Sequence, residues 1–215
     1  GDGQLGAFAY NTKITKCDLS GVTGWGTSAT LPGSAFAGCT ALQEVVLPGD
    51  VQVIGEYAFF NCTALTTVNL PQVNRIDQYA FQVCTSLAEL TLDNVTAIGL
   101  DAFFGCTSLQ TLKIPKCTRF GNYIVTGCSS LTRIEATAAG DFVDMDNDSI
   151  ERNAVFHNRS THSGDNAFNP ANCDLVLNVD KKEDGSAVPK VSNGNGWTVA
   201  QYSGPLMIWK SIGFQ

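Results

Sequence analysis

Three aspartates at alternate positions, Asp144, Asp146 and Asp148, have a spacing that could bind a metal ion. Alternating carboxylates open the calcium loop of the EF-hand type, which then requires glycine at its sixth position and glutamate at its twelfth. The sequence has Ser149 and Val155 at these two positions. An acidic loop exposed to solvent is therefore the favoured interpretation, and neither a metal site nor a cofactor is predicted.

The two histidines, His157 and His162, lie near Asp165 and suggest either a metal site or a hydrolase. Their separation of five residues suits neither one face of a helix nor one face of a strand. The sequence also lacks H-E-x-x-H and the G-x-S-x-G nucleophile motif. We therefore expect histidines of a surface loop and no catalytic residue. An enzyme with a site in residues 141–170 is the less favoured alternative.

Five of the eight cysteines recur at intervals of 22 or 23 residues: Cys39, Cys62, Cys84, Cys106 and Cys128. If successive copies stack, identical positions lie about 4.8 Å apart with their Cβ atoms pointing the same way, which suits a disulfide torsion poorly. No C-x-x-C motif is present, so the usual redox and zinc spacings are absent. A ladder of reduced, buried thiols is favoured over paired disulfides, because cysteine packs well as a small apolar residue.

The cysteines belong to a longer repeat, whose copies start at Ala35, Ala58, Ala80, Ala102 and Ile124. Each copy contains L-x-x-V/L-x-L or a close variant, and the last two apolar residues lie two apart, as in a strand. A period of 22 residues indicates a solenoid, since it is too short for a propeller blade or a helix pair. Stacked coils would bury one phenylalanine spine, formed by Phe36, Phe59, Phe81 and Phe103.

The consensus sequence of the repeat is A-F-x-x-C-T-S-L-x-x-L-x-L-P, with I-G before the next copy. This consensus resembles the BspA-type leucine-rich repeats that are common in bacterial surface proteins. The match is close from residue 35 to about residue 137. It implies an α/β-class leucine-rich-repeat solenoid, mostly β, in which a right-handed stack of coils has one parallel strand per repeat. We expect these strands at residues 43–47, 66–70, 88–92, 110–114 and 132–136.

The repeat boundaries divide the chain into segments of one continuous domain. Residues 1–34 are interpreted as an N-terminal capping coil and residues 35–140 as five repeats. Residues 141–166 are interpreted as an irregular insertion. Repeat-like sequence resumes at "AFNPANCDLVLNV", and residues 167–215 are expected to form this resumed coil and a C-terminal cap that contains Trp197 and Trp209.

The composition excludes some classes of function. Charged residues make up 15% of the chain, the formal net charge is −7, and lysine and arginine form no cluster. Nucleic-acid binding is therefore not expected, because it requires clustered cations. No apolar stretch approaches the roughly 20 residues of a membrane span. A polar but charge-poor surface is more typical of secreted β-rich proteins.

Residues that alternate with the buried ones project from the face of the expected strands. The central members of this strand face are Thr67, Asn69, Glu89, Thr91 and Lys113. Together with the family resemblance, they predict a non-catalytic, adhesin-like interaction module, secreted or at the cell surface, that binds a protein or a host-matrix macromolecule. The insertion at residues 141–166 is the alternative site. A structural spacer within a larger surface protein is the alternative function.

Overall fold

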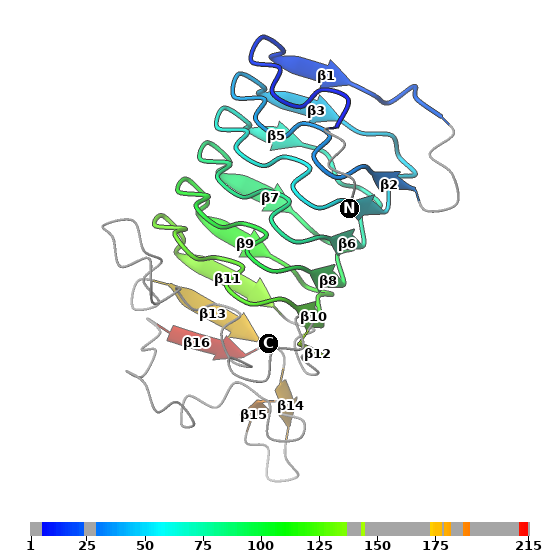
Figure 1. The fold of residues 1–215 in the computed structure, drawn as a ribbon. Coiled ribbons are helices and arrows are strands. Elements are labelled where there is room, and N and C mark those ends of the chain that lie inside the picture. Colours follow the sequence, from blue (N-terminus) through cyan, green and yellow to red (C-terminus); the bar gives the residue numbers. More distant parts are fainter. Residues whose placement is uncertain are drawn as a thin grey trace.

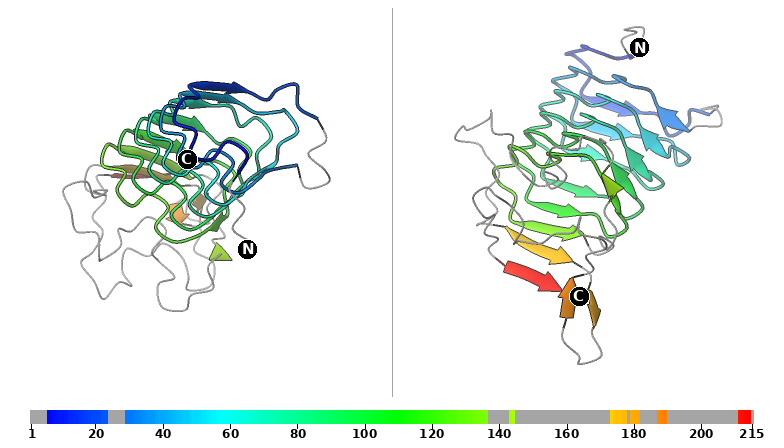
Figure 2. Two further views of the ribbon diagram at one scale, coloured as in Figure 1. Left: turned by 45° about the horizontal axis from the view of Figure 1, so that its top comes forward. Right: turned by 60° about the horizontal axis from the view of Figure 1, so that its bottom comes forward.

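The computed structural model describes residues 6–23, 29–136, 143–144, 173–177, 179–181, 187–189 and 211–214. Within these residues the chain winds into a stack of coils that contains strands and turns but no helix (Figure 1). Parallel strands run along two sides of the stack: one side carries a single six-stranded sheet, and the other side, here called the first sheet, is divided into a three-stranded and a five-stranded part. Figure 2 shows the same stack from two further directions.

The first strand of each coil lies at the position predicted from the leucine register, although it is shorter than expected. These strands are β3 (Glu44–Val46), β5 (Thr67–Val68), β7 (Glu89–Thr91), β9 (Thr111–Lys113) and β11 (Arg133–Ala136). A further strand, β1 (Lys16–Asp18), lies in the segment interpreted as an N-terminal capping coil and pairs in parallel with β3. The pairing keeps equivalent residues opposite each other, as with Leu90 and Leu112. Every coil therefore repeats the inward and outward pattern of its neighbours.

The structure adds a second, shorter strand to most coils. These strands are β2 (Thr30–Leu31), β4 (Val53–Ile54), β6 (Arg75–Ile76), β8 (Ala97–Ile98), β10 (Arg119–Phe120) and β12 (Val143–Asp144), and they form one six-stranded parallel sheet. Their inward side chains, such as Ile54, Ile76 and Ile98, are fully buried. The second apolar group of each repeat thus packs against the first from the opposite side of the coil.

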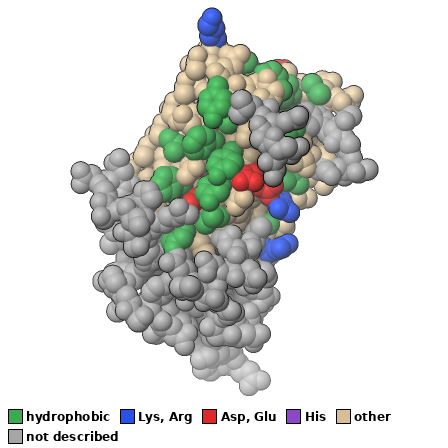
Figure 3. Space-filling model, in the orientation of Figure 1, with side chains coloured by type: hydrophobic (Ala, Val, Ile, Leu, Met, Phe, Trp, Pro, Cys, Tyr) green, Lys and Arg blue, Asp and Glu red, His purple; other side chains and the backbone are tan. Residues whose placement is uncertain are grey.

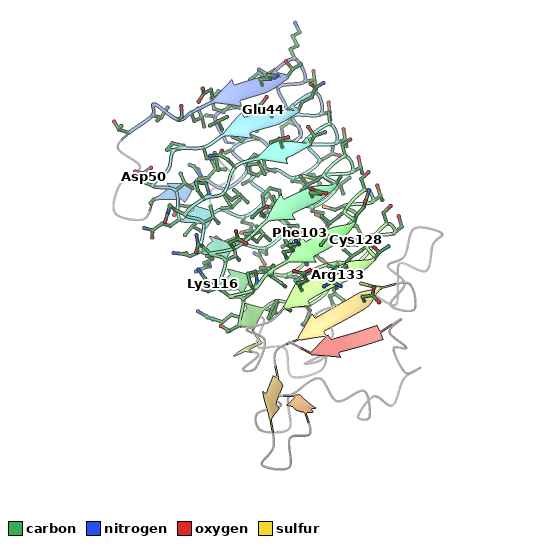
Figure 4. All side chains as sticks on the ribbon, turned by 180° about the vertical axis from the view of Figure 1, so that it is seen from behind. Glu44, Asp50, Phe103, Lys116, Cys128 and Arg133 are labelled. Atoms are coloured by element: carbon green, nitrogen blue, oxygen red, sulfur yellow. The ribbon has the colours of Figure 1, made fainter. Side chains whose placement is uncertain are left out.

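The phenylalanine rings form a column through the interior. Phe8, Phe36, Phe59, Phe81 and Phe103 stack in this order, with centroid distances of 5.1, 5.4, 5.1 and 5.7 Å and interplanar angles of 16° or less. Figure 4 labels Phe103 within the stack. Because each inner ring packs between two neighbours, no coil could bury its own ring without the adjacent coils.

The thiols form a second column beside the rings. Cys39, Cys62, Cys84, Cys106 and Cys128 are buried and free of disulfides. Each Sγ donates to the carbonyl oxygen of the phenylalanine one coil earlier, at 3.0 to 3.2 Å. Burial raises the pKa of Cys62 and of Cys106 to about 12. These thiols therefore remain protonated and able to donate at neutral pH.

The first sheet continues beyond the repeats. β13 (Asp174–Leu177) pairs in parallel with β11, and β16 (Ser211–Phe214) pairs with β13. A separate two-stranded antiparallel sheet is formed by β14 (Val179–Lys181) and β15 (Ala187–Pro189). Only β12 is described within the insertion expected at residues 141–166. The other residues of that segment and of 167–215, including Trp197 and Trp209, lie outside the described residues.

Candidate functional site

The five predicted binding residues lie close together on the strand face of the first sheet. Thr67 belongs to β5, Glu89 and Thr91 to β7, and Lys113 to β9, and all four are exposed. Thr91 and Lys113 are opposite each other in the β7–β9 pair. Side chains from three consecutive coils therefore face solvent on one surface.

Asn69, the fifth predicted residue, is half-buried and its side chain is already engaged. Its Oδ1 accepts a hydrogen bond from the backbone N–H of Leu47 at 2.6 Å, and its Nδ2 donates to the Leu47 carbonyl oxygen at 3.3 Å. The amide side chain thereby extends the pairing of β5 with β3 past the end of β3. Asn69 therefore supports the sheet, while one N–H and one oxygen lone pair of its amide are not used by these two hydrogen bonds.

Ion pairs lie on either side of the centre of the strand face. Lys16 pairs with Glu44 at 2.8 Å on β1 and β3, and Arg133 pairs with Glu135 at 2.6 Å on β11. Figure 4 labels Glu44 and Arg133 at these two places. Between them, Glu89 and Lys113 form no ion pair with any described residue. Charge is therefore available to a partner at the centre of the face.

One repeat position links successive coils through the backbone along the first sheet. At this position a backbone N–H donates to the carbonyl oxygen of the equivalent residue one coil earlier. The bonds run from Thr66 to Gln43 at 3.0 Å, from Gln110 to Ala88 at 3.1 Å, and from Thr132 to Gln110 at 3.0 Å. The carbonyl of Thr66 has the same place in its coil, yet no backbone hydrogen bond joins it to Ala88 in the described structure. The regular series of hydrogen bonds is interrupted once, between β5 and β7.

The sheet topology shows the same interruption. Strands β1, β3 and β5 form one sheet, whereas β7, β9, β11, β13 and β16 form another. The two coils remain bonded elsewhere, since Phe59 N–H donates to the Ala80 carbonyl at 2.8 Å and β6 pairs with β8. We call this interruption of the first sheet the β5–β7 opening.

Side-chain hydrogen bonds close both ends of the β5–β7 opening. At one end Thr85 Oγ1 donates to the Thr63 carbonyl oxygen at 3.2 Å. At the other end Asn94 Nδ2 donates to the Pro71 carbonyl oxygen at 2.9 Å. The opening is therefore a bounded feature of the strand face rather than a general separation of the two coils.

A groove of about 560 Å³ lies over the opening. It is lined by residues 66–71 of one coil and by residues 89–91, 93 and 94 of the next. The core beneath it is slightly exposed: Val68 is 9% exposed and Leu90 is 6% exposed, whereas Leu112, the equivalent of Leu90 one coil further on, is 0% exposed. Four predicted binding residues line the groove: Thr67, Asn69, Glu89 and Thr91.

Asp93 and Asn94 are groove residues that the sequence analysis missed. The other central copies have proline after the strand, at Pro48, Pro71 and Pro115, whereas this copy has Asp93. That departure from the repeat was a usable signal. The sequence contained no signal for the β5–β7 opening, because Thr66 and Ala88 are ordinary residues for their position.

Aromatic residues gather on another surface, on the segment that returns from the second sheet to the first. Tyr57 stacks on Tyr79 with a centroid distance of 4.7 Å, and Phe60 meets Tyr57 edge to face at 5.7 Å. Figure 3 shows hydrophobic side chains over the middle of the face that it presents. The stacked tyrosine faces cover each other, so this cluster is explained by packing between coils.

The histidines and aspartates considered as metal or catalytic residues in the sequence lie almost wholly outside the described residues. Among the residues that the structure describes, no three His, Cys, Asp or Glu side chains could together hold a metal ion. His157, His162, Asp146, Asp148 and Asp165 lie outside the described residues, and of Asp144 only the backbone is described, in β12. The described residues include no helix that could span a membrane.

The fold has counterparts among solved structures. A T. pallidum leucine-rich repeat protein is 27% identical, with a TM-score of 0.53, over 63% of this chain and 71% of that chain. A leucine-rich cell surface protein of Faecalibacterium prausnitzii is 27% identical over 58% of this chain, with a TM-score of 0.47. A leucine-rich repeat protein of Bacteroides ovatus is 20% identical over 53% of this chain, with a TM-score of 0.35. This chain covers 38% and 34% of the last two proteins.

Comparison with curated protein sequences finds no match. The sequence model of the BspA-type leucine-rich repeat region matches residues 5–132 in six copies, which is more than half of the chain. The matched span begins before the five repeats read from the sequence and includes β1. The chain belongs to the BspA-type leucine-rich repeat family.

Proposed function

We propose that this chain is a non-catalytic interaction module, secreted or at the surface of a bacterial cell, that binds a protein partner through the strand face. The observation that carries the proposal is the groove at the centre of this face, where exposed polar side chains from two coils surround the β5–β7 opening. Ligand sites are concave and carry a few convergent polar groups.

Two further features support this function. The repeats of this chain are of a type that is common in bacterial surface proteins. The polar, charge-poor composition is typical of secreted chains. The core of stacked rings holds the strand face rigidly, so a partner would bind a preformed surface. Binding to a preformed surface avoids part of the entropy cost of association.

The test is a binding screen of the whole chain against immobilised host-matrix proteins and glycans, followed by a variant of the strand face. Thr67, Glu89, Thr91 and Lys113 are replaced together by alanine, whereas Asn69 is left in place because it supports β3. The four side chains are exposed, so the fold should be retained. The expected result is at least a tenfold loss of affinity for the partner found in the screen.

A matched control replaces three exposed residues outside the strand face, Gln52, Gln72 and Arg119, by alanine. This variant should bind as the unmodified chain does. If instead the strand-face variant retains full affinity, the site moves to the insertion at residues 141–166, and the strand-face proposal fails. If no matrix protein or glycan binds, the chain is better explained as a structural spacer of a larger surface protein.

A further inference from the structure

We infer that the first coil of the stack, described over residues 6–23, pairs with the first coil of a second copy of this chain. The inference goes beyond the proposed function, because it concerns the N-terminal end of the stack and not the strand face. It depends on three observations: the incomplete burial of the first coil, the open edge of β1, and the charges of that strand.

The core is less well covered in the first coil than in the next one. Four apolar side chains of the first coil are only partly buried, at positions where the second coil has side chains that are 0–2% exposed. These residues are Phe8, Ile14, Cys17 and Leu19, and their equivalents are Phe36, Leu42, Val45 and Leu47. The same repeat positions are thus fully buried only where a coil lies on both sides.

The outer surface of the first coil is also apolar. Phe8 stacks on Phe36 at 5.1 Å, and no second described ring stacks on it. Tyr10 is 60% exposed and Val22 is 45% exposed, which makes them the exposed large apolar residues of the described chain. A terminal repeat that caps a solenoid has a polar outer face. Exposed apolar surface of this kind is typical of a protein interface.

Strand β1 is an edge strand in the described structure and lies at the outer end of the stack (Figure 1). The Thr15 carbonyl oxygen accepts from β3 at 3.3 Å, and the Leu19 N–H donates to β3 at 2.8 Å. Alternate residues of a strand direct their backbone groups to opposite neighbours. Lys16 and Asp18 therefore direct their N–H and C=O groups outward, where a strand of another chain can pair with them.

An antiparallel pair of two β1 strands, centred on Cys17, satisfies both the backbone and the charges. Lys16 of each copy then lies opposite Asp18 of the other copy, and each such pair forms two backbone hydrogen bonds. The side chains of Lys16 and Asp18 are exposed, and opposite charges across a strand pair are favourable. The strand is thus complementary to itself, as the interface of a two-fold dimer must be.

The neighbouring charges are compatible with this pairing. Lys16 contacts Glu44 at 2.8 Å, but an ammonium group has three donors and can contact a second carboxylate. Asp18 accepts the N–H of Ser20 through Oδ1 at 2.9 Å, so Oδ2 can accept from the lysine. Lys13 would lie opposite a glycine of the other copy in the same register. No like charges therefore meet across the pair.

The pairing has a consequence for binding. Opposite residues of an antiparallel pair point to the same side of the sheet, so the strand faces of the two copies would form one continuous surface. A dimer would then present two strand-face grooves to the same partner surface. Two linked sites bind a repetitive or immobilised partner more tightly than one site does.

The first experiment is sedimentation velocity of the whole chain over a wide range of concentration, at low salt and with a reductant. We expect a monomer–dimer equilibrium. Lys16→Asp and Asp18→Lys should each dimerise at least tenfold more weakly, because like charges then lie opposite each other in both pairs. An equimolar mixture of these two variants should recover the dimer, since every acidic side chain then faces a lysine. The control Lys116→Asp changes an exposed lysine elsewhere by the same charge and should dimerise as the unmodified chain does.

Cys17 tests the register of the pair. It is the one cysteine of the eight that is not buried. In the centred pair its two Cα atoms lie about 4.5 Å apart, within the range of a disulfide. Added diamide, which takes two electrons and two protons from two thiols, should therefore link the unmodified chain into a dimer. In the variant Cys17→Ser with Thr15→Cys the exposed positions of the two copies lie about 14 Å apart, so this variant should stay unlinked.

Three results would overturn the inference. They are a monomer at every concentration, polymers in place of a dimer, or a mixture of the two charge variants that dimerises no better than either variant alone. Equal linking of the Thr15→Cys variant would overturn the pairing centred on Cys17. The strand-face variant should still dimerise, so the dimer and the proposed function can fail independently.

Discussion

The thiol of Cys84 donates a hydrogen bond to the carbonyl oxygen of Phe59, one coil earlier, at a distance of 3.2 Å. The same oxygen accepts the backbone N–H of Cys62, in its own coil, at 3.1 Å. One carbonyl group thus links two coils and ties the thiol column to the ring column. Because cysteine combines a small apolar side chain with a weak donor, the repeated pair of residues satisfies both packing and hydrogen bonding.

Replacement of Phe81 by alanine should destabilise the fold by about 3–5 kcal/mol, the usual cost of an aromatic cavity in a packed core. The ring is fully buried between Phe59 at 5.1 Å and Phe103 at 5.7 Å, so its loss breaks the column in the middle. Urea denaturation of the variant measures the change. The control is Gln78→Ala in the same coil, at an exposed position, which should change stability by less than about 0.5 kcal/mol.

The buried thiols predict a loss of stability at high pH. Burial raises the pKa of Cys62 and Cys106 from 9.0 to about 12 in the folded chain. Between these values the unfolded chain binds fewer protons than the folded chain, so the free energy of unfolding falls as the pH rises. This contribution is fully present below pH 9 and is lost progressively towards pH 12, by about 1.4 kcal/mol per pH unit and thiol at most.

The measurement is urea denaturation between pH 7 and pH 10.5 with a reductant present. The variant Cys106→Ala should show a shallower decline above pH 9 than the unmodified chain, since one titrating thiol is removed. Tyrosines and lysines titrate in both proteins and therefore cancel in the comparison. Identical slopes would show that Cys106 does not hold its proton in the folded state.

The sequence was sufficient to predict the features that recur in every coil. The spacing of Leu87, Leu90 and Leu92 located β7, and the recurrence of phenylalanine predicted the stack that the ring distances show. A repeated residue must occupy a repeated environment, so periodicity alone determines which side chains meet. The second strand was harder to predict, because two residues such as Val53 and Ile54 are too few for an alternating pattern.

The features that occur once could not be predicted in this way. Thr66 and Ala88 are compatible with a normal backbone hydrogen bond, and only the arrangement of the two coils shows that it is missing. Asn69 was expected to face a ligand because it alternates with buried residues, but its amide reaches the backbone of the previous coil. Alternation predicts the direction of a side chain and does not predict its partner.

The variant Val83→Gly should stabilise the chain by about 0.5–1 kcal/mol. Val83 has a φ of +63°, a region that a β-branched residue adopts only with strain. Glycine occupies the same turn position in other coils, at Gly105 with φ +70° and Gly127 with φ +75°. The reverse change, Gly105→Val, should destabilise the chain, so opposite shifts of the urea midpoint are expected. A lower midpoint for Val83→Gly would show that packing of the valine outweighs the strain.

The variant Gly99→Ala should destabilise the chain by about 1–3 kcal/mol, the cost of overpacking a well-filled site. A Cβ at Gly99 would lie 2.5 Å from the backbone nitrogen of Gln78 and 2.8 Å from the carbonyl carbon of Asp77. These are main-chain atoms of the preceding coil, so no side-chain rotation can relieve the contact and the two coils must separate.

Gly49→Ala is the matched control, because a Cβ at Gly49 would meet nothing within 4 Å. Both changes reduce the freedom of the unfolded chain equally, which by itself stabilises by about 0.4–1 kcal/mol. Urea denaturation of the pair therefore isolates the contact between coils: Gly49→Ala should be as stable as the unmodified chain or slightly more so, and Gly99→Ala clearly less stable. If the two variants have the same stability, the coils are not held in contact at Gly99 and the close stacking of the second sheet would need revision.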